Sequence, residues 1–341
     1  MSGFLAAGIV LVGVSVGAVA YFAGEGASAG ARAPEAALGF VPRSAGLIGH
    51  VDLRSIASSP LGDTWAEGLK ERKPIAAIED LRESTGVDVL EDVDALTFSV
   101  SSQKAARGQE RWGMAVTGSF DFDGLVKKLS EQEKDVKKET HAGTTLYLLT
   151  GPAEPPGKTG ASEAPRTFAM AHPDDATLLV GDAGYLREML DTRDRGEEPA
   201  AALLEGWGYG GLEAETFWIA GNPPGFLDSM VSRGTELPPP LRSFAITGRL
   251  DSDVVLKARG KATDPDSAQK LAEVARGFVA LGRLREGSAS QGERGRMFAR
   301  IAESVQIDQL AEEIEVSLLL SYDTIRELMK SQGKEVAAQK N

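Results

Sequence analysis

His50 and Asp52 are a pair with the chemistry of a general base and an acid that orients it. They fall in a stretch typical of a β-strand, Leu47–Leu53, so their side chains share one face. Such a pair activates a serine or cysteine nucleophile, but the chain has no cysteine and no motif places a serine beside it. We therefore expect His50 to be a structural histidine with satisfied hydrogen bonds.

The other histidines and the acidic clusters lack the spacing of metal ligands. We expect His141 in a polar loop and His172 before a turn, and neither is at ligand spacing from another histidine. The run Asp121–Gly124 resembles the start of a calcium loop, but the twelfth position is Gln132, where a bidentate glutamate is required. Its carboxylates are better suited to capping a helix. The sequence thus predicts no metal, no cofactor, no catalytic residue and no enzymatic activity.

Two glycine-rich stretches match functional motifs only in their letters. Gly13–Gly17 reads GVSVG, but it lies in an apolar helix and not at the strand-to-helix turn of a nucleophile elbow. Gly206–Gly211 reads GWGYGG, but a helix precedes it and a strand follows it, the reverse of a dinucleotide site. We interpret it as a hinge between two lobes. Its aromatic residues, Trp207 and Tyr209, are candidates for contact with a partner or ligand, and Trp65 is a third.

The composition excludes several classes of function. The 341 residues carry a formal net charge of -13, whereas a nucleic-acid binder normally has a basic face, so we expect no nucleic-acid partner. The lack of cysteine excludes disulfides, thiolate nucleophiles, iron–sulfur clusters and a lipidated cysteine. With 42% hydrophobic and 26% charged residues, the composition is that of a globular protein, and the length suggests about two domains.

An uncharged apolar stretch, Phe4–Ala23, predicts one membrane-spanning helix within residues 1–24. Such a helix reaches about 30 Å, the thickness of a bilayer's hydrocarbon core. The alternatives are a signal peptide, cleaved after Ala29 to give a secreted form, and a core helix of a soluble protein. We favour an uncleaved anchor, because the apolar run is long for a signal peptide and has no basic flank.

The anchor implies a protein of the bacterial cell envelope, with the region after it in the periplasm or outside the cell. A short N-terminal apolar helix commonly acts as an export signal, although the flanking charges cancel and say little about orientation. Gly13 and Gly17 form a G-x-x-x-G pattern, which lets two helices approach closely in lipid and would support a homo-oligomer. We also expect a protein partner in the envelope.

The remaining chain divides into a flexible linker at 25–37, α+β lobes at 38–206 and 207–332, and a disordered tail at 333–341. The fold class is α+β, with antiparallel sheets and helices packed on one face. Both lobes run strand, helix, hairpin and Asp-capped helix in the same order, so we also predict a duplicated βαββαββα-type unit. The predicted strands are Leu47–Leu53, Ala95–Ser101, Trp112–Phe120, Thr144–Thr150, Arg166–His172, Thr177–Gly181, Thr216–Gly221, Arg242–Leu250, Asp253–Thr263, Val305–Leu310 and Glu313–Ser321.

Two segments resemble a group of uncharacterised bacterial envelope proteins with an N-terminal anchor and repeated α+β modules. Phe40–Asp63 reads FVPRSAGLIGHVDLRSIASSPLGD, a strand followed by a helix entered through S-P-L-G. Pro173–Arg193 reads PDDATLLVGDAGYLREMLDTR, a turn, a strand ending in V-G, and a helix. The resemblance implies the architecture over roughly residues 38–330, and it transfers no functional residue.

These features favour a membrane-tethered, extracytoplasmic, non-enzymatic module for protein interaction or envelope structure. The alternative is a carrier or sensor of an apolar ligand, held in a cavity between sheet and helices. An enzyme that uses carboxylates alone is a third reading. An interaction module should expose an apolar or aromatic patch near Trp207, a carrier should enclose a continuous apolar cavity, and an enzyme should gather carboxylates in a cleft.

Overall fold

The computed structural model describes nine segments of the chain, at residues 35–60, 82–83, 85–89, 91–103, 111–132, 136–150, 167–222, 241–284 and 301–325. They belong to two compact units, the first with 35–54 and the described residues from 82 to 203, the second with 55–60 and those from 204 to 325. The predicted membrane helix with Gly13 and Gly17, the cleavage site at Ala29, Trp65 and the tail at 333–341 lie outside the described residues. Within the described segments, no helix is long and apolar enough to cross a membrane.

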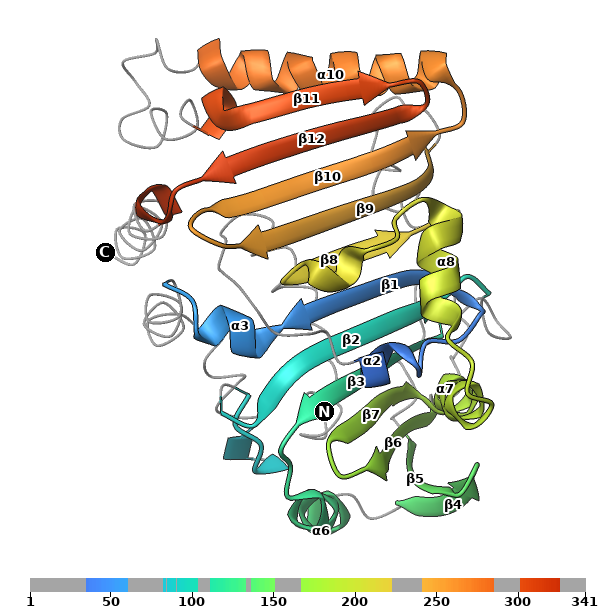
Figure 1. The fold of residues 1–341 in the computed structure, drawn as a ribbon. Helices are drawn as coiled ribbons and strands as arrows, with labels where there is room; N and C mark the ends of the chain where they lie inside the picture. Colours follow the sequence, from blue (N-terminus) through green and yellow to red (C-terminus); the bar gives the residue numbers. More distant parts are fainter. Residues whose placement is uncertain are drawn as a thin grey trace, which may run out of the picture. The chain divides into compact units, whose positions relative to one another are not determined.

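The first unit is built on an antiparallel sheet whose neighbouring strands follow the order β1-β2-β3-β7-β6-β5-β4 (Figure 1). Its strands are β1 (Ala45–Asp52), β2 (Val93–Ser101), β3 (Trp112–Gly118), β4 (Lys137–His141), β5 (Thr144–Thr150), β6 (Thr167–Asp174) and β7 (Thr177–Asp182). The chain runs as a meander from β1 to β3 and continues through α6 (Phe122–Gln132). It then enters the sheet again at the β4 edge and returns strand by strand to β3.

The core of the first unit lies between this sheet and α7 (Ala183–Asp194), which packs on β3, β6 and β7. The helix begins at Asp182, whose carboxylate accepts a hydrogen bond from the Tyr185 amide at 3.0 Å. Leu186 and Met189 then point into the core, where both are almost fully buried. Gly113 of β3 lets the helix approach, because a Cβ there would collide with Met189.

Two segments of the first unit differ from the sequence predictions. The linker was predicted to run to Ala37, but Glu35–Leu38 form the short helix α2, and Ala37 is only 1% exposed in the core. His141 was predicted in a polar loop, but it ends β4, an edge strand that the sequence analysis did not predict. The sequence of β4, KKETH, lacks the apolar alternation of a half-buried strand, because the strand is exposed at most positions.

The second unit has an antiparallel sheet in the order β8-β9-β10-β12-β11 (Figure 1). Its strands are β8 (Phe217–Gly221), β9 (Leu241–Leu250), β10 (Val254–Ala262), β11 (Val305–Leu310) and β12 (Glu313–Leu320). The helix α10 (Pro265–Leu284) packs on β10, β11 and β12. It begins at Asp264, whose carboxylate accepts a hydrogen bond from the Ser267 amide at 2.7 Å, and this bond lowers the pKa of Asp264.

The protein is therefore a mixed α+β protein with antiparallel sheet and a small number of helices among its described residues, as the sequence predicts. Every predicted strand forms, with ends within two residues of the predicted ones. Other helices are α3 (Leu53–Ala57), α8 (Pro199–Trp207) and the 3-10 turn η1 (Leu212–Ala214), and residues 301–304 and 322–325 are also helical.

Candidate functional site

The candidate site of the second unit begins at the end of α8, in the glycine-rich stretch. The Tyr209 amide donates to the Leu204 carbonyl at 2.7 Å, and the Gly208 amide donates to the Glu205 carbonyl at 2.9 Å. Gly208 has a φ of 88°, in the left-handed region. Together these bonds form a Schellman motif, which ends a helix and satisfies its last carbonyls. The GWGYGG stretch is therefore a helix cap, and this cap fixes the direction in which Tyr209 leaves the helix.

Tyr209 is held over the sheet by polar contacts at its hydroxyl. Its ring is buried, with 4% of its surface exposed, and its hydroxyl donates a long hydrogen bond of 3.4 Å to the Arg259 carbonyl. The Ser243 hydroxyl lies 3.4 Å from the Tyr209 hydroxyl and donates to the Trp207 carbonyl at 2.9 Å. Burial raises the pKa of Tyr209 above its usual value, so the phenol remains protonated and neutral at physiological pH.

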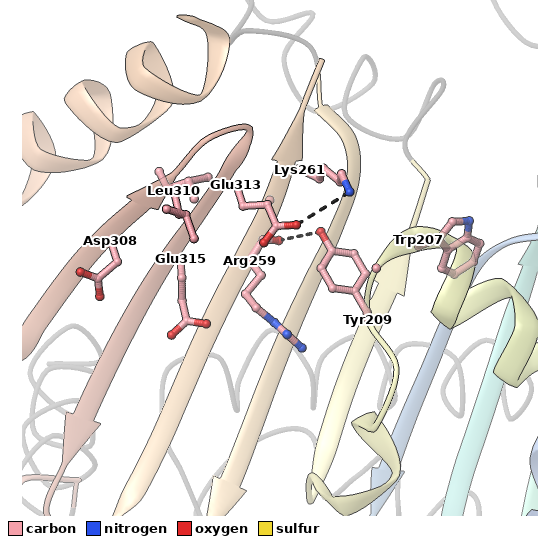
Figure 2. Close-up of a pocket in the computed structure, with 11 residues that line it drawn as sticks. Trp207, Tyr209, Arg259, Lys261, Asp308, Leu310, Glu313 and Glu315 are labelled. Carbon is pink, nitrogen blue, oxygen red and sulfur yellow. Dashed lines mark hydrogen bonds and ion pairs between the residues drawn. The ribbon is translucent and has the colours of Figure 1, made fainter. Parts of the chain in front are cut away.

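A pocket with a volume of about 170 Å³ lies between this cap and the strands β10, β11 and β12 (Figure 2). Trp207 and Tyr209 contribute aromatic surface, and Leu310, which is 80% exposed, contributes apolar surface. The charged residues that line the pocket are Arg259, Lys261, Asp308, Glu313 and Glu315. The volume is close to that of a cavity that holds one benzene ring, about 150 Å³, and smaller than a typical small-molecule site of about 300 Å³ or more.

Most of the charges around the pocket are paired across neighbouring strands. Lys261 lies 3.8 Å from Glu313, and Lys257, just outside the pocket, lies 3.5 Å from Glu315. Arg259 stands between these two lysines on β10, and its guanidinium lies 5.2 Å from the centroid of the Tyr209 ring. The Tyr209 ring thus positions Arg259, whereas ion pairs with glutamates position Lys257 and Lys261.

Two residues of this pocket were predicted from the sequence, and the others, Arg259 among them, were not. The structure brings Trp207 and Tyr209, both predicted as contact residues, to the same pocket, whereas Trp65 lies outside the described residues. Arg259 was not predicted. The sequence places Lys257, Arg259 and Lys261 at every second position of a predicted strand, which puts three cations on one face, but nothing in it indicates that Tyr209 lies beside them.

The histidines lie elsewhere, in the first unit. His50 is buried in β1 and its Nδ1 lies 2.9 Å from the Thr97 hydroxyl; burial lowers its pKa to about 4. His141 contacts Asp191 of α7 at 2.7 Å, and His172 stacks on Phe122 with ring centroids 4.3 Å apart. In the described segments, no three His, Asp or Glu side chains are placed to hold a metal ion.

Comparison with known proteins adds little to this description. No protein-family profile matches the sequence, and no curated protein is significantly similar to it. Among solved structures, crystal form III of TP0453 is similar with a TM-score of 0.45 and 11% sequence identity, covering 87% of this chain and 98% of that one. Crystal form IV of TP0453 gives a TM-score of 0.44 and 10% identity, covering 86% and 96%.

Proposed function

We propose that this chain is a non-enzymatic interaction module of the bacterial cell envelope, which binds a protein partner through the pocket beside Tyr209. The observation that carries the proposal is the meeting of Trp207, Tyr209 and the exposed Leu310 around one small pocket with charged walls. Aromatic residues and arginine, surrounded by polar groups, are the usual composition of the centre of a protein interface.

The size and lining of the pocket favour a partner side chain over a free apolar ligand. About 170 Å³ suits a single large side chain, whereas carriers of apolar ligands enclose larger cavities with mainly apolar walls. A further apolar surface supports a role in interaction. Val274, Phe278 and Leu281 form one stripe on α10 and are 52%, 70% and 59% exposed. Contiguous apolar surface of this kind marks interaction sites on soluble domains.

We further propose that the chain is tethered by the apolar segment Phe4–Ala23, with the two units on the outer side of the membrane. The support is the sequence itself, which provides an uncharged run long enough to span a bilayer. The tether predicts that the full-length chain sediments with membranes and resists extraction by alkaline carbonate. Protease added outside spheroplasts should degrade the two units. A freely soluble, unprocessed, full-length chain in the cytosolic fraction would contradict the tether.

The strand orders support our proposal that the two units descend from one duplicated βαββαββα-type unit. In each unit, three strands are neighbours in both chain and sheet: β1-β2-β3 and β8-β9-β10. An Asp-capped helix follows, and the last strand of the unit then pairs with the third: β7 with β3, and β12 with β10. The first unit has one additional hairpin, β4–β5, at the edge of its sheet.

The experiment that tests the interaction uses the full-length chain in its native membrane. A photoreactive phenylalanine analogue replaces Trp207 in one variant and Ser252 in the control, where Ser252 lies in the exposed β9–β10 turn. The proposal expects one protein cross-linked from position 207, not from 252, with the cross-link lost when Tyr209→Ala is added. The absence of any protein cross-link from 207, together with uptake of a hydrophobic dye, would instead favour the carrier of an apolar ligand.

A further inference from the structure

Arg259 carries an unsatisfied donor at the wall of the pocket. Its Nε is buried and has no hydrogen-bond partner among the described residues. Its guanidinium also forms no ion pair with any residue in the segments that the structure describes, and it stacks on the Tyr209 ring. A cationic group at a pocket wall that has no counter-ion keeps its terminal N–H donors for an anion from outside the chain.

The position of Arg259 is fixed by its surroundings. Tyr209, on which it stacks, is held by the Schellman cap of α8 and by the hydroxyl of Ser243. Figure 2 shows the guanidinium pointing away from the pair of Lys261 and Glu313, with the Tyr209 ring on one side. A guanidinium that is already oriented loses little conformational freedom when it binds a ligand.

The other charges near the pocket do not compensate Arg259. Glu313 is occupied by Lys261, and Glu315, opposite Arg259 on β12, is occupied by Lys257. Asp308 faces Glu315 from β11 on the opposite side from Arg259, with β12 between them. Arg259 and Asp308 are therefore the two pocket charges without an ion pair among the described residues, and β12 lies between them.

We propose that the pocket binds a carboxylate on a small apolar or aromatic group, with the Arg259 guanidinium as its receptor. The two terminal nitrogens of an arginine form a fork of donors that matches the two oxygens of a carboxylate. Trp207, Tyr209 and Leu310 then contact the apolar part of the ligand, which the volume of about 170 Å³ limits to about one ring. This inference rests on the proposed function and names the group by which the partner is recognised.

The test compares isosteric probes that differ only in charge. Benzoate and benzamide are titrated into the full-length, ¹⁵N-labelled chain, and the indole N–H signal of Trp207, assigned with Trp207→Phe, is followed. Benzoate should shift the signal saturably, whereas benzamide should not. In a second arm, the blocked peptide acetyl-Gly-Glu-Gly-amide is compared with its Gln counterpart. Binding of the Glu peptide identifies a side chain of a protein partner as the source, and binding of benzoate alone identifies a free small acid.

Variants assign the effect to Arg259. Arg259→Lys keeps the charge but loses the fork, so benzoate should bind about tenfold more weakly or worse. Arg259→Gln should abolish saturable binding. The matched control is Arg249→Gln, an exposed arginine on the neighbouring strand β9 that does not line the pocket. Circular dichroism and thermal unfolding show whether each variant is folded. If Arg259→Gln does not fold, Arg259→Lys alone provides the test.

Three results would overturn the inference: equal binding of benzamide and benzoate, undiminished binding by folded Arg259→Gln, and no binding of either carboxylate. These outcomes are independent of the cross-linking experiment. A partner cross-linked from position 207 without any preference for carboxylates would leave the interaction proposal standing and remove this one. Saturable binding of benzoate without a cross-linked partner would support the carboxylate site and remove the proposal of a protein partner.

Discussion

The hydroxyl of Tyr185 donates a hydrogen bond to the hydroxyl of Ser99 over 3.1 Å, and both residues are at most 1% exposed. The bond joins α7 to β2, so two elements 86 residues apart in the chain are tied by one pair of polar atoms inside the core. Burial raises the pKa of Tyr185 well above its usual value, so the phenol stays protonated and keeps its role as donor. The contact therefore positions the helix on the sheet.

Removing either hydroxyl should destabilise the first unit. Tyr185→Phe leaves the Ser99 hydroxyl without its donor, and Ser99→Ala leaves the Tyr185 hydroxyl without its acceptor, so we expect each to cost about 1 to 2 kcal/mol of unfolding free energy. The double variant should lose less than the sum, because the second change removes the group that the first left unpaired. Urea unfolding of the four proteins gives this coupling energy. Strict additivity would mean that the hydrogen bond does not contribute.

His50 makes the stability of the first unit depend on pH. Burial lowers its pKa to about 4, whereas the unfolded chain has the ordinary value of about 6.5, so between these values the unfolded state binds more protons. The stabilisation is complete above about pH 6.5 and decreases as the pH falls towards 4. From pH 7 to pH 5 this group should remove about 2 kcal/mol of unfolding free energy.

His50→Gln isolates this contribution from that of the carboxylates. Glutamine has a polar group that can bond the Thr97 hydroxyl, and it does not titrate, so the variant should lose less stability than the parent between pH 7 and pH 5. The measurement is chemical unfolding at both pH values. An NMR titration of the His50 ring with a midpoint near 6.5 in the folded protein would contradict the prediction.

The strands could be predicted from the sequence because most of them have at least one buried face. Strands such as Ala95–Ser101 and Thr144–Thr150 show β-branched and apolar residues bounded by turn residues, and this is the pattern of a sheet with at least one buried face. β4 was missed because its positions are mostly exposed, so nothing selects apolar residues there. The Asp-capped helix predicted in each lobe is confirmed, with the caps at Asp121 and Asp264, since a cap is a local feature of the chain.

Only part of the candidate site could be predicted from the sequence. Trp207 and Tyr209 stand out as aromatic residues among glycines, and a local pattern is sufficient to find them. Arg259 is fifty residues away from Tyr209, and their meeting depends on how Tyr209, which follows α8, lies against β10. That placement results from packing in three dimensions, which a single sequence does not encode locally.

The cap at Gly208 should be sensitive to substitution in a way that its neighbour Gly206 is not. Gly208 has a φ of 88°, so Gly208→Ala should cost about 1 to 2 kcal/mol and displace Tyr209. Gly206 lies within α8, and a Cβ there meets no atom within 4 Å, so Gly206→Ala should be neutral or stabilise by up to about 1 kcal/mol.

The two alanine variants also separate stability from the site. Thermal unfolding measures the first effect, and Trp207 fluorescence or its indole N–H signal reports the second. Both properties should change in Gly208→Ala alone. Equal stability of the two variants would mean that the left-handed conformation at Gly208 is not required.

Glycine and phenylalanine face each other between the first two strands of both units, as Gly49 with Phe98 and Gly248 with Phe217. A Cβ at either glycine would collide with the ring opposite, which is buried and has little room to move. We expect Gly248→Ala and Gly49→Ala each to cost about 1 to 3 kcal/mol, the usual cost of overpacking a core. The matched control is Gly277→Ala in α10, where a Cβ meets no atom within 4 Å.

The decisive variant pairs Gly248→Ala with Phe217→Leu. Leucine lacks the ring atoms that the new methyl group would meet, so the double variant should be more stable than the sum of the two single changes predicts. The same rescue should occur for Gly49→Ala with Phe98→Leu, because the same pairing exists in the first unit. Urea unfolding measures both cycles. If the losses of unfolding free energy in the single variants simply add in the double variant, the new methyl group does not collide with the ring. The cost of each alanine then comes from the strand backbone.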